Sequence, residues 1–232
     1  MMRTWRLDDS RQTLVLGSDR DHLAEVVYWG PCLPKDADLE VIYRAHAIDV
    51  TGGMLDINPE LSICPEATRS FPGQPGLVIR RENGRPYLPK FCFDRVDQDG
   101  STLELWFKDQ DEILTYSARF SIDPETHVIE AKSSIEASEP MHLHWLAAPV
   151  FPAPQSSDEM IDFAGRWCGE FQMNRTSWSA GMRYRENRTG RTGHEHFPGL
   201  IVPCRGATNA TGQAYGFHYG WSGGHRMIAE EL

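Results

Sequence analysis

The chain has 232 residues, a hydrophobic content of 40% and a formal net charge of -10 at pH 7. These values permit one large domain or two small ones with an ordinary globular core. They disfavour a nucleic-acid partner, because phosphate binding needs a concentrated basic patch and the sequence contains no run of lysine and arginine.

The cysteines lie far apart and form no Cys-x-x-Cys pair of the kind that zinc ribbons and thioredoxin-like centres use; they are Cys32, Cys64, Cys92, Cys168 and Cys204. We interpret them as reduced, mostly structural thiols. The first residues, Met1 to Asp8, lack the apolar core of a signal peptide, and no run approaches the roughly 20 apolar residues that cross a bilayer. We therefore expect a cytoplasmic protein with no membrane partner.

Strand-like segments begin near the N-terminus. Thr13 to Leu16 and His22 to Trp29 flank a Ser-Asp-Arg-Asp turn, which predicts an opening hairpin. From Leu39 to about Gly76 the pattern dissolves into Gly- and Pro-containing turns. Within that stretch, Leu39 to His46 fits a short helix or a strand, and periodicity does not decide between them. A loop this long is usually functional or packed against a partner.

Regular alternation returns after this loop. Leu103, Leu105 and Phe107 recur with period two, which is typical of a half-buried strand. Further strands are predicted around residues 90–96, 113–122, 128–137, 141–148, 171–174, 181–186, 200–202 and 214–219. Such a series, without an amphipathic helix longer than about two turns, predicts an all-β fold built as a large antiparallel β-sandwich with few short helices.

The proline-rich segment from Pro149 to Ser157 is the best candidate for a linker, although a crossover between sheets would have the same composition. The strands predicted after it are too few and too short to bury a separate core easily. We therefore expect a single domain over residues 1–232.

Two pairs of histidines have a spacing that suits metal ligands. His142 and His144 are two apart on a predicted strand, and His194 and His196 would also share one face if their segment is extended. A zinc site needs a third protein ligand, which the sequence does not place. Surface or hydrogen-bonding histidines are the simpler interpretation, so we expect no metal.

An imidazole and a carboxylate suffice for a mutarotase-type reaction, which needs only proton transfer at the anomeric hydroxyl and the ring oxygen. His144 with Glu170, or His194 with Glu195, are conceivable pairs, and nothing in the sequence selects either. The sequence contains no nucleophile elbow, phosphate-binding glycine loop or dinucleotide fingerprint, so we expect no cofactor.

Seven tryptophans in an acidic domain suggest a sugar platform, because the apolar face of a pyranose stacks on an exposed indole. Trp106 and Trp145 fall inside predicted strands, which favours the core for both. Trp167 stands in a predicted loop whose small neighbours, Gly165 and Gly169, allow a ligand to approach. Burial at a sheet edge is the alternative for Trp167.

Several short motifs, in their order along the chain, resemble those of the family 36 glycoside hydrolases, the bacterial α-galactosidases. They are Val27-Tyr28-Trp29-Gly30, Phe71-Pro72-Gly73, Gly165-Arg166-Trp167, the segment from Arg191 to Pro198, and Gly212 to Phe217 leading into Tyr219-Gly220-Trp221-Ser222-Gly223. No single motif is specific, but their order covers nearly the whole chain. One departure is that Phe71 to Gly76 runs into Leu77-Val78-Ile79-Arg80, where the family usually has Asp-Phe-Arg; this suggests a divergent branch.

The resemblance implies that the chain is the N-terminal supersandwich domain of such an enzyme, of the galactose-mutarotase-like type. In that family a (β/α)8 barrel supplies two catalytic aspartates, which retaining hydrolysis needs about 5 Å apart. The Lys-Trp-Asp run of the family's nucleophile is absent from this sequence. We therefore expect no catalytic residue in this chain, and a role in packing on the barrel and in contacts of a homo-oligomer.

The resemblance also implies a part in binding an α-galactoside. The tryptophan of the family's Gly-x-Trp segment lines the galactose site and matches Trp167. An aspartate from the first long loop takes part as well; Asp49 lies nearest by spacing, and Asp56 competes with it. The alternatives are a stand-alone carbohydrate-binding or mutarotase-like domain, and a structural module whose pocket residues are idle.

Overall fold

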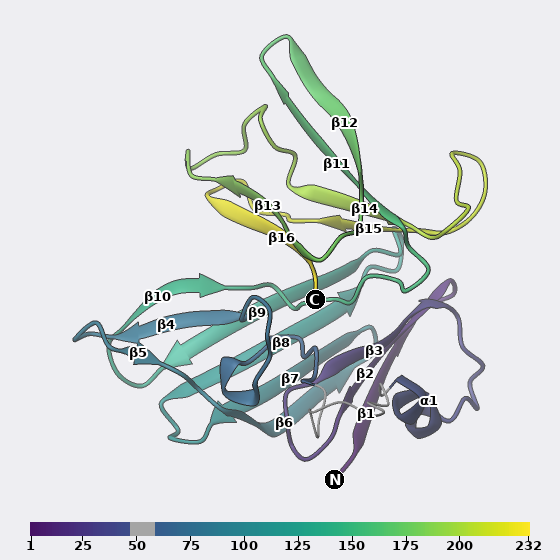
Figure 1. Cartoon of the computed structure of the whole chain (residues 1–232). Helices are drawn as coiled ribbons and strands as arrows, with labels where there is room; N and C mark the ends of the chain where they lie inside the picture. Colours follow the sequence, from purple (N-terminus) through teal and green to yellow (C-terminus); the bar gives the residue numbers. More distant parts are fainter. Residues whose placement is uncertain (47–58) are drawn as a thin grey trace. The chain divides into compact units, whose positions relative to one another are not determined.

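The computed structural model describes residues 1–46 and 59–232, and nearly all of its regular secondary structure is β-strand (Figure 1). Its first elements are β1 (Arg3–Asp8), β2 (Gln12–Ser18), β3 (Glu25–Pro31), α1 (Leu39–His46), the 3-10 turn η1 (Ala67–Arg69), β4 (Leu77–Arg81), β5 (Pro86–Tyr87), β6 (Phe91–Asp99), β7 (Thr102–Asp109), β8 (Leu114–Ile122), β9 (Ile129–Ala137) and β10 (Met141–Leu146). They are followed by β11 (Glu159–Arg166), β12 (Gly169–Ser177), β13 (Gly181–Asn187), β14 (Gly199–Pro203), β15 (Ala214–His218) and β16 (His225–Glu231). The predicted all-β class is confirmed.

The described residues form two compact units, Met1–Pro152 (unit 1) and Ala153–Leu232 (unit 2). Their boundary falls inside the proline-rich segment from Pro149 to Ser157 that the sequence marks as the best linker candidate.

Unit 1 contains three antiparallel sheets, with strand orders β1-β2-β3, β10-β4-β5 and β6-β7-β8-β9. The predicted opening hairpin is present as the β2–β3 pair, in which Leu14 lies opposite Trp29. The long strands β6 to β9 form a meander of sequential neighbours, drawn in teal in Figure 1. Strands of all three sheets contribute to one buried cluster, which is the pattern of a sandwich core.

Period-two alternation explains which face of β7 enters this core. Leu103, Leu105 and Phe107 are almost completely buried, as their spacing predicts. Trp106 has the opposite phase and is only half-buried, with the guanidinium of Arg95 4.0 Å from its ring centre. The expectation that Trp106 belongs to the core is therefore wrong, because the apolar positions of β7 fix the opposite face as the buried one.

Trp145 is also half-buried rather than part of the core. Its indole Nε1 donates a hydrogen bond to the carbonyl oxygen of Pro75 at 3.0 Å. A half-buried indole needs a partner for its N–H group, and the backbone of the loop before β4 supplies it.

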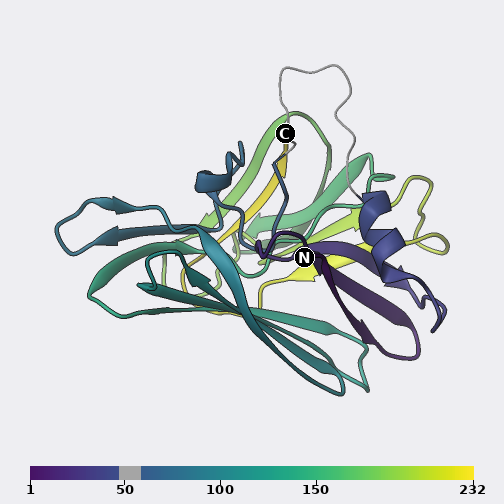
Figure 2. The same cartoon turned by 90° about the horizontal axis from the view of Figure 1, so that it is seen from below.

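The ambiguous segment Leu39–His46 is the helix α1. The carboxylate of Asp38 caps it by accepting hydrogen bonds from the amides of Glu40 and Val41 at 3.0 and 3.1 Å. Figure 2 shows α1 beside the sheet β1-β2-β3. In residues 1–46 and 59–232, no helix is long and apolar enough to cross a membrane.

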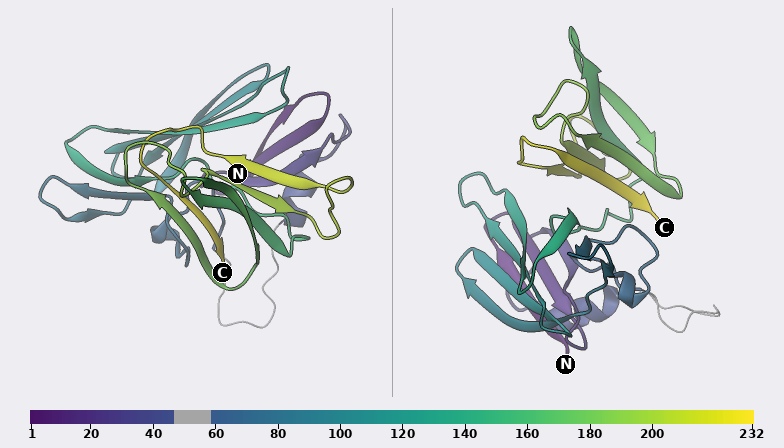
Figure 3. Two further views of the ribbon diagram at one scale, coloured as in Figure 1. Left: turned by 90° about the horizontal axis from the view of Figure 1, so that it is seen from above. Right: turned by 90° about the vertical axis from the view of Figure 1, so that its left-hand side faces the viewer.

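Unit 2 contains the sheet β12-β11-β14-β15 and the two-stranded sheet β13-β16. Its buried cluster is small and consists of Met160, Leu200, Val202 and Ala229, with Trp178, Phe217 and Met227 packed against it. β11 and β12 form a long hairpin whose tip extends beyond the other strands of unit 2 (Figure 3). This hairpin carries the tryptophan that the sequence singles out.

Candidate functional site

Trp167 lies at the tip of the β11–β12 hairpin. The register pairs Phe163 with Met173, shifts between Ala164 and Arg166, and closes with Arg166 opposite Gly169, which leaves Trp167 and Cys168 as the turn. Cys168 has a φ of 59°, in the left-handed region. The predicted loop is thus a tight turn, and the indole of Trp167 is 76% exposed instead of buried at a sheet edge.

Gly165 makes this turn possible. A Cβ atom at this position would lie 2.4 Å from the carbonyl oxygen of Gly169 and 2.8 Å from Cα of Glu170. The two strands therefore approach each other at the bulge more closely than any side chain allows.

The exposed indole is supported from one side. The imidazole of His194 meets it edge to face, with 5.5 Å between the ring centres and 80° between the planes. Nδ1 of His194 lies 3.6 Å from Oε1 of Glu170, and the same Glu170 oxygen accepts a hydrogen bond from the amide of Cys168 at 3.1 Å. Hydrogen bonds from backbone amides and the nearby His194 outweigh desolvation and hold the pKa of Glu170 below its usual range.

A shallow, open cavity lies beside His194 and Glu170. It is lined by Phe163, Ala164, Glu170, Phe171, Thr192, Gly193, His194 and Phe197. The rings of Phe163 and Phe171 both lie against Phe197, at 6.2 and 5.8 Å between centres. Aromatic walls beside a few polar groups are typical of small-molecule sites, sugar sites among them.

The segment that carries His194 and His196 is not an extended strand, so the two imidazoles are not arranged as a pair. His196 forms an isolated backbone bridge with Ala164, and its Nδ1 atom is buried without a hydrogen-bond partner among the described residues. The other pair, His142 and His144, lies on β10. The pairing of β10 with β4 is irregular between Leu143 and Trp145, and His144, which lies between them, has no partner residue in the register. Within residues 1–46 and 59–232, no three His, Cys, Asp or Glu residues are grouped to hold a metal ion.

The contact between His194 and Glu170 combines one residue from each of the two imidazole–carboxylate pairs that the sequence suggests. Sequence reasoning missed it because the two residues come from separate segments, which meet only because residues 195–197 form backbone hydrogen bonds with β11. The aromatic lining was missed as well. A hairpin that turns at Trp167 would have placed Phe163 on the strand before the turn and Phe171 on the strand after it. The observed pairing of Phe163 with Met173 has this arrangement.

The other candidate for sugar binding, Asp49, lies outside the described residues, as does its competitor Asp56. Trp167 is therefore the one predicted binding residue whose surroundings the structure describes.

Comparison with known proteins relates both units to one family. The model of the glycosyl hydrolase family 36 N-terminal domain matches residues 22–232. The chain is 32% identical to an α-galactosidase of Escherichia coli over 97% of this chain and 31% of the relative. It is 27% identical to a probable α-galactosidase G of Aspergillus terreus, over 64% of this chain and 21% of that protein. The chain thus spans about a third or less of these curated relatives.

Solved structures agree in fold. A family 36 α-galactosidase of Geobacillus stearothermophilus superposes with a TM-score of 0.83 at 19% identity, over 98% of this chain and 35% of that one. Variants of the same enzyme have been solved in complex with raffinose and with stachyose. Because the family model matches almost the whole sequence, the chain belongs to the N-terminal domain family of glycosyl hydrolase family 36.

Proposed function

We propose that this chain is the non-catalytic N-terminal domain of an α-galactosidase-like glycoside hydrolase that removes terminal α-galactosyl units. The relatives that it matches are α-galactosidases, and it corresponds to about a third of the E. coli enzyme. Retaining hydrolysis needs a pair of carboxyl groups across the glycosidic bond. We place that pair in the remaining part of the enzyme, a (β/α)8 barrel on which this domain packs. We also assign to this domain contacts between the subunits of a homo-oligomer.

In this proposal Trp167 contacts the terminal galactose. The observation that carries it is the 76% exposure of an indole on a turn with no room for side chains at Gly165. An exposed indole offers an apolar ring to a ligand, and the less polar face of galactose suits such a ring. His194 contacts the indole and Glu170 lies beside His194, and the high exposure of Trp167 leaves the rest of the ring open to a sugar.

The test is the substitution Trp167→Ala in the full-length enzyme. Losing one stacking contact of about 1–2 kcal/mol raises KM for an aryl α-galactoside roughly 5- to 30-fold. The melting temperature stays unchanged, because the side chain is exposed. Trp221→Ala is the matched control, since Trp221 is also exposed in unit 2, at 58%, and should leave KM unaltered. Equal KM values for the wild type and Trp167→Ala would remove Trp167 from the site.

We also propose that Asp49 binds a galactose hydroxyl, on the strength of its position in the first long loop. Asp49→Asn in the full-length enzyme should raise KM at least several-fold, because a charged hydrogen bond contributes about 1.5–3 kcal/mol. Asp56→Asn serves as the control. If only Asp56→Asn raised KM, the role would pass to Asp56.

A further inference from the structure

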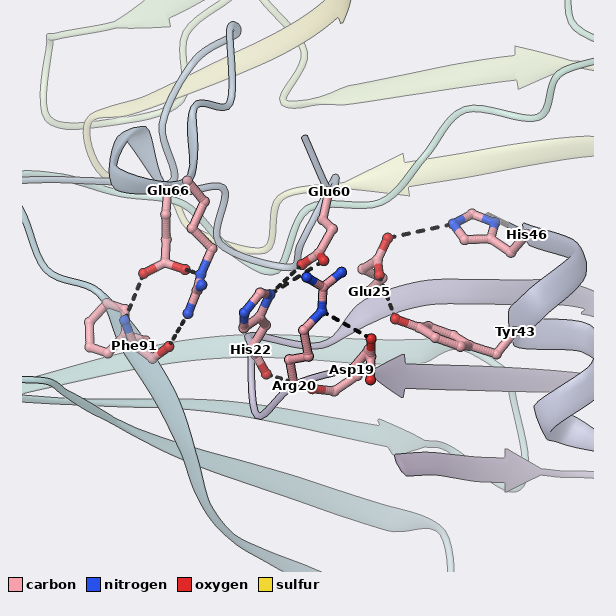
Figure 4. Close-up of polar contacts among 11 residues, drawn as sticks. Asp19, Arg20, His22, Glu25, Tyr43, His46, Glu60, Glu66 and Phe91 are labelled. Atoms are coloured by element: carbon pink, nitrogen blue, oxygen red, sulfur yellow. Dashed lines mark hydrogen bonds and ion pairs between the residues drawn. The ribbon is translucent and has the colours of Figure 1, made fainter. Parts of the chain in front are cut away.

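A buried glutamate of unit 1 lies where α1 meets the sheet β1-β2-β3. Glu25, the first residue of β3, is only 9% exposed. Its Oε1 atom accepts a hydrogen bond from the hydroxyl of Tyr43 at 3.0 Å, and its Oε2 atom lies 3.8 Å from Nε2 of His46 (Figure 4). Both partners belong to α1, so the carboxyl group links the helix directly to the sheet.

The helix depends on contacts of this kind. α1 has eight residues, none of them buried, and a helix this short is marginal by itself. The ring of Tyr43 lies directly over Gly17 of β2, where an added Cβ atom would come within 2.3 Å of Cδ2 of the ring. Tyr43 therefore packs on the sheet with its ring and bonds Glu25 with its hydroxyl. The state of the Glu25 carboxyl group bears on the docking of the whole helix.

Few groups around Glu25 are available to neutralise a negative charge on its carboxyl group. Glu60, from the segment before β4, and Asp19, from the turn before β3, both act on Glu25 as negative charges. The nearby cationic side chains already have partners: Nδ1 of His22 lies 3.0 Å from Glu60, and Nε of Arg20 lies 3.2 Å from Asp19 (Figure 4). On the helix side the facing groups are Tyr43 and His46.

These surroundings favour the neutral carboxyl group. Burial first, and then the charge of Glu60, raise the pKa of Glu25 to about 7, although the hydrogen bond from Tyr43 acts in the opposite direction. Burial also lowers the pKa of His46. Because burial raises the pKa of Glu25 and lowers the pKa of His46, it disfavours a charged pair between them, and the hydrogen bond from Tyr43 is the main polar contact between Glu25 and α1.

We propose that the buried carboxyl group of Glu25 is a protonation-dependent link between β3 and α1, which holds the helix while the group is neutral and loosens it when the proton is lost. The neutral group still accepts the hydrogen bond from Tyr43 through its carbonyl oxygen. The ionised group adds a second buried negative charge beside Glu60, and an undocked helix relieves it by admitting water.

The direct test is an NMR titration of the 232-residue chain between pH 4 and 9, which follows the carboxyl carbon of Glu25 and the backbone amides of α1. We expect the Glu25 carbon to titrate with a midpoint near 7, and the amides of α1 to shift, with faster hydrogen exchange after correction for pH, around the same midpoint. A Glu25 midpoint near 4.5, or α1 amides that do not respond across the Glu25 transition, would overturn the proposal.

Three variants separate the link between Glu25 and α1 from general effects on unit 1. Glu25→Gln keeps the neutral form and should hold α1 at every pH, without the transition near pH 7. Gly17→Ala displaces the ring of Tyr43 and should loosen α1 at every pH. Glu66→Gln is the matched control, because Glu66 is also buried but bonds Arg69 and the amide of Phe91; its α1 transition should match that of the wild type.

A transition near pH 7 that persists in Glu25→Gln would assign the titration to another group and contradict the proposal. If Glu25→Gln does not fold, the wild-type carbon titration still decides the matter.

Discussion

At the residue scale, the turn that presents Trp167 depends on how closely two backbones approach. Gly165 and Gly169 flank the turn, and their surroundings differ. A Cβ atom at Gly165 would collide with backbone atoms at 2.4 and 2.8 Å, whereas one at Gly169 would meet the side chain of Arg166 at an ordinary 3.5 Å. The glycine at 165 is required by the backbone, and the one at 169 is not.

Gly165→Ala should therefore destabilise unit 2 by about 1–3 kcal/mol, because the strands of the hairpin must separate to admit the methyl group. It should also displace Trp167 and raise KM in the full-length enzyme. Gly169→Ala is the matched control and should change the melting temperature little. Urea unfolding of both variants measures the difference, and equal stabilities would show that the close contact at Gly165 relaxes without cost.

A second prediction at the residue scale concerns Glu25 and the way the free energy of unfolding depends on pH. Its pKa is raised from 4.5 to about 7 on folding, so the folded state binds the proton more tightly than the unfolded state. The stabilisation that Glu25 contributes is therefore complete below about pH 4.5 and is lost as the pH rises through about 7. Above that pH it stays constant, and the total loss is up to about 3 kcal/mol. Urea unfolding at pH 5 and pH 8 should show this loss in the wild type and not in Glu25→Gln. Parallel profiles for the two proteins would refute it.

For single residues, prediction from the sequence succeeded where the structure depends on neighbours close in the chain. Small residues around Trp167 predicted a loop, and the loop is an exposed turn. It failed for Trp106, where the phase of the flanking apolar residues decides the buried face. It missed the contact of His194 with Glu170 because that contact depends on the tertiary path of two separate segments.

At the element scale, unit 2 relies on a buried ion cluster as well as on its small apolar core. Asp162 of β11 is only 2% exposed and lies 2.8 Å from Nη2 of Arg183 and 3.4 Å from Nη2 of Arg185, both on β13. Asn174 of β12 donates a further hydrogen bond to it at 2.9 Å. Burial acts to raise the pKa of Asp162, but these partners outweigh it and lower the pKa below its usual value. The cluster joins the two sheets of the unit.

Asp162→Ala should cost about 3 kcal/mol in the stability of unit 2, because it leaves two partly buried guanidinium groups without their counter-ion. Asp158→Ala is the control: Asp158 and Arg205 form an exposed pair, with 55% and 74% of their side chains accessible, which contributes at most about 1 kcal/mol. Since the pKa of Asp162 is lowered, its contribution is present near neutral pH and is lost as the pH falls below about 4. Equal losses in the two variants at pH 7 would contradict this assignment.

The elements themselves were predictable where periodicity is strong. The alternation in β7 and the turns between β6, β7, β8 and β9 follow directly from the sequence. Leu39–His46 remained ambiguous because α1 owes its structure to the Asp38 cap and to the docking of Tyr43 on Gly17, a contact between segments that local propensity does not contain.

At the scale of the whole molecule, the series of strand-like segments predicts the all-β class, and the order of short motifs predicts the family, which the family model confirms over residues 22–232. The expectation of one domain over 1–232 remains a proposal, and the boundary between the two compact units falls in the segment that the sequence marks as a linker. The small core of unit 2 fits the estimate that its strands bury little surface by themselves.

The central claim is that this domain serves α-galactoside hydrolysis without performing it. The most direct measurement compares the 232-residue chain with the full-length enzyme on an aryl α-galactoside, with anomerisation of galactose followed in parallel. We expect turnover by the full-length enzyme and none by the chain alone in either reaction. Fast anomerisation by the chain would favour a mutarotase-like domain, and release of the aryl group by the chain alone would contradict the non-catalytic assignment.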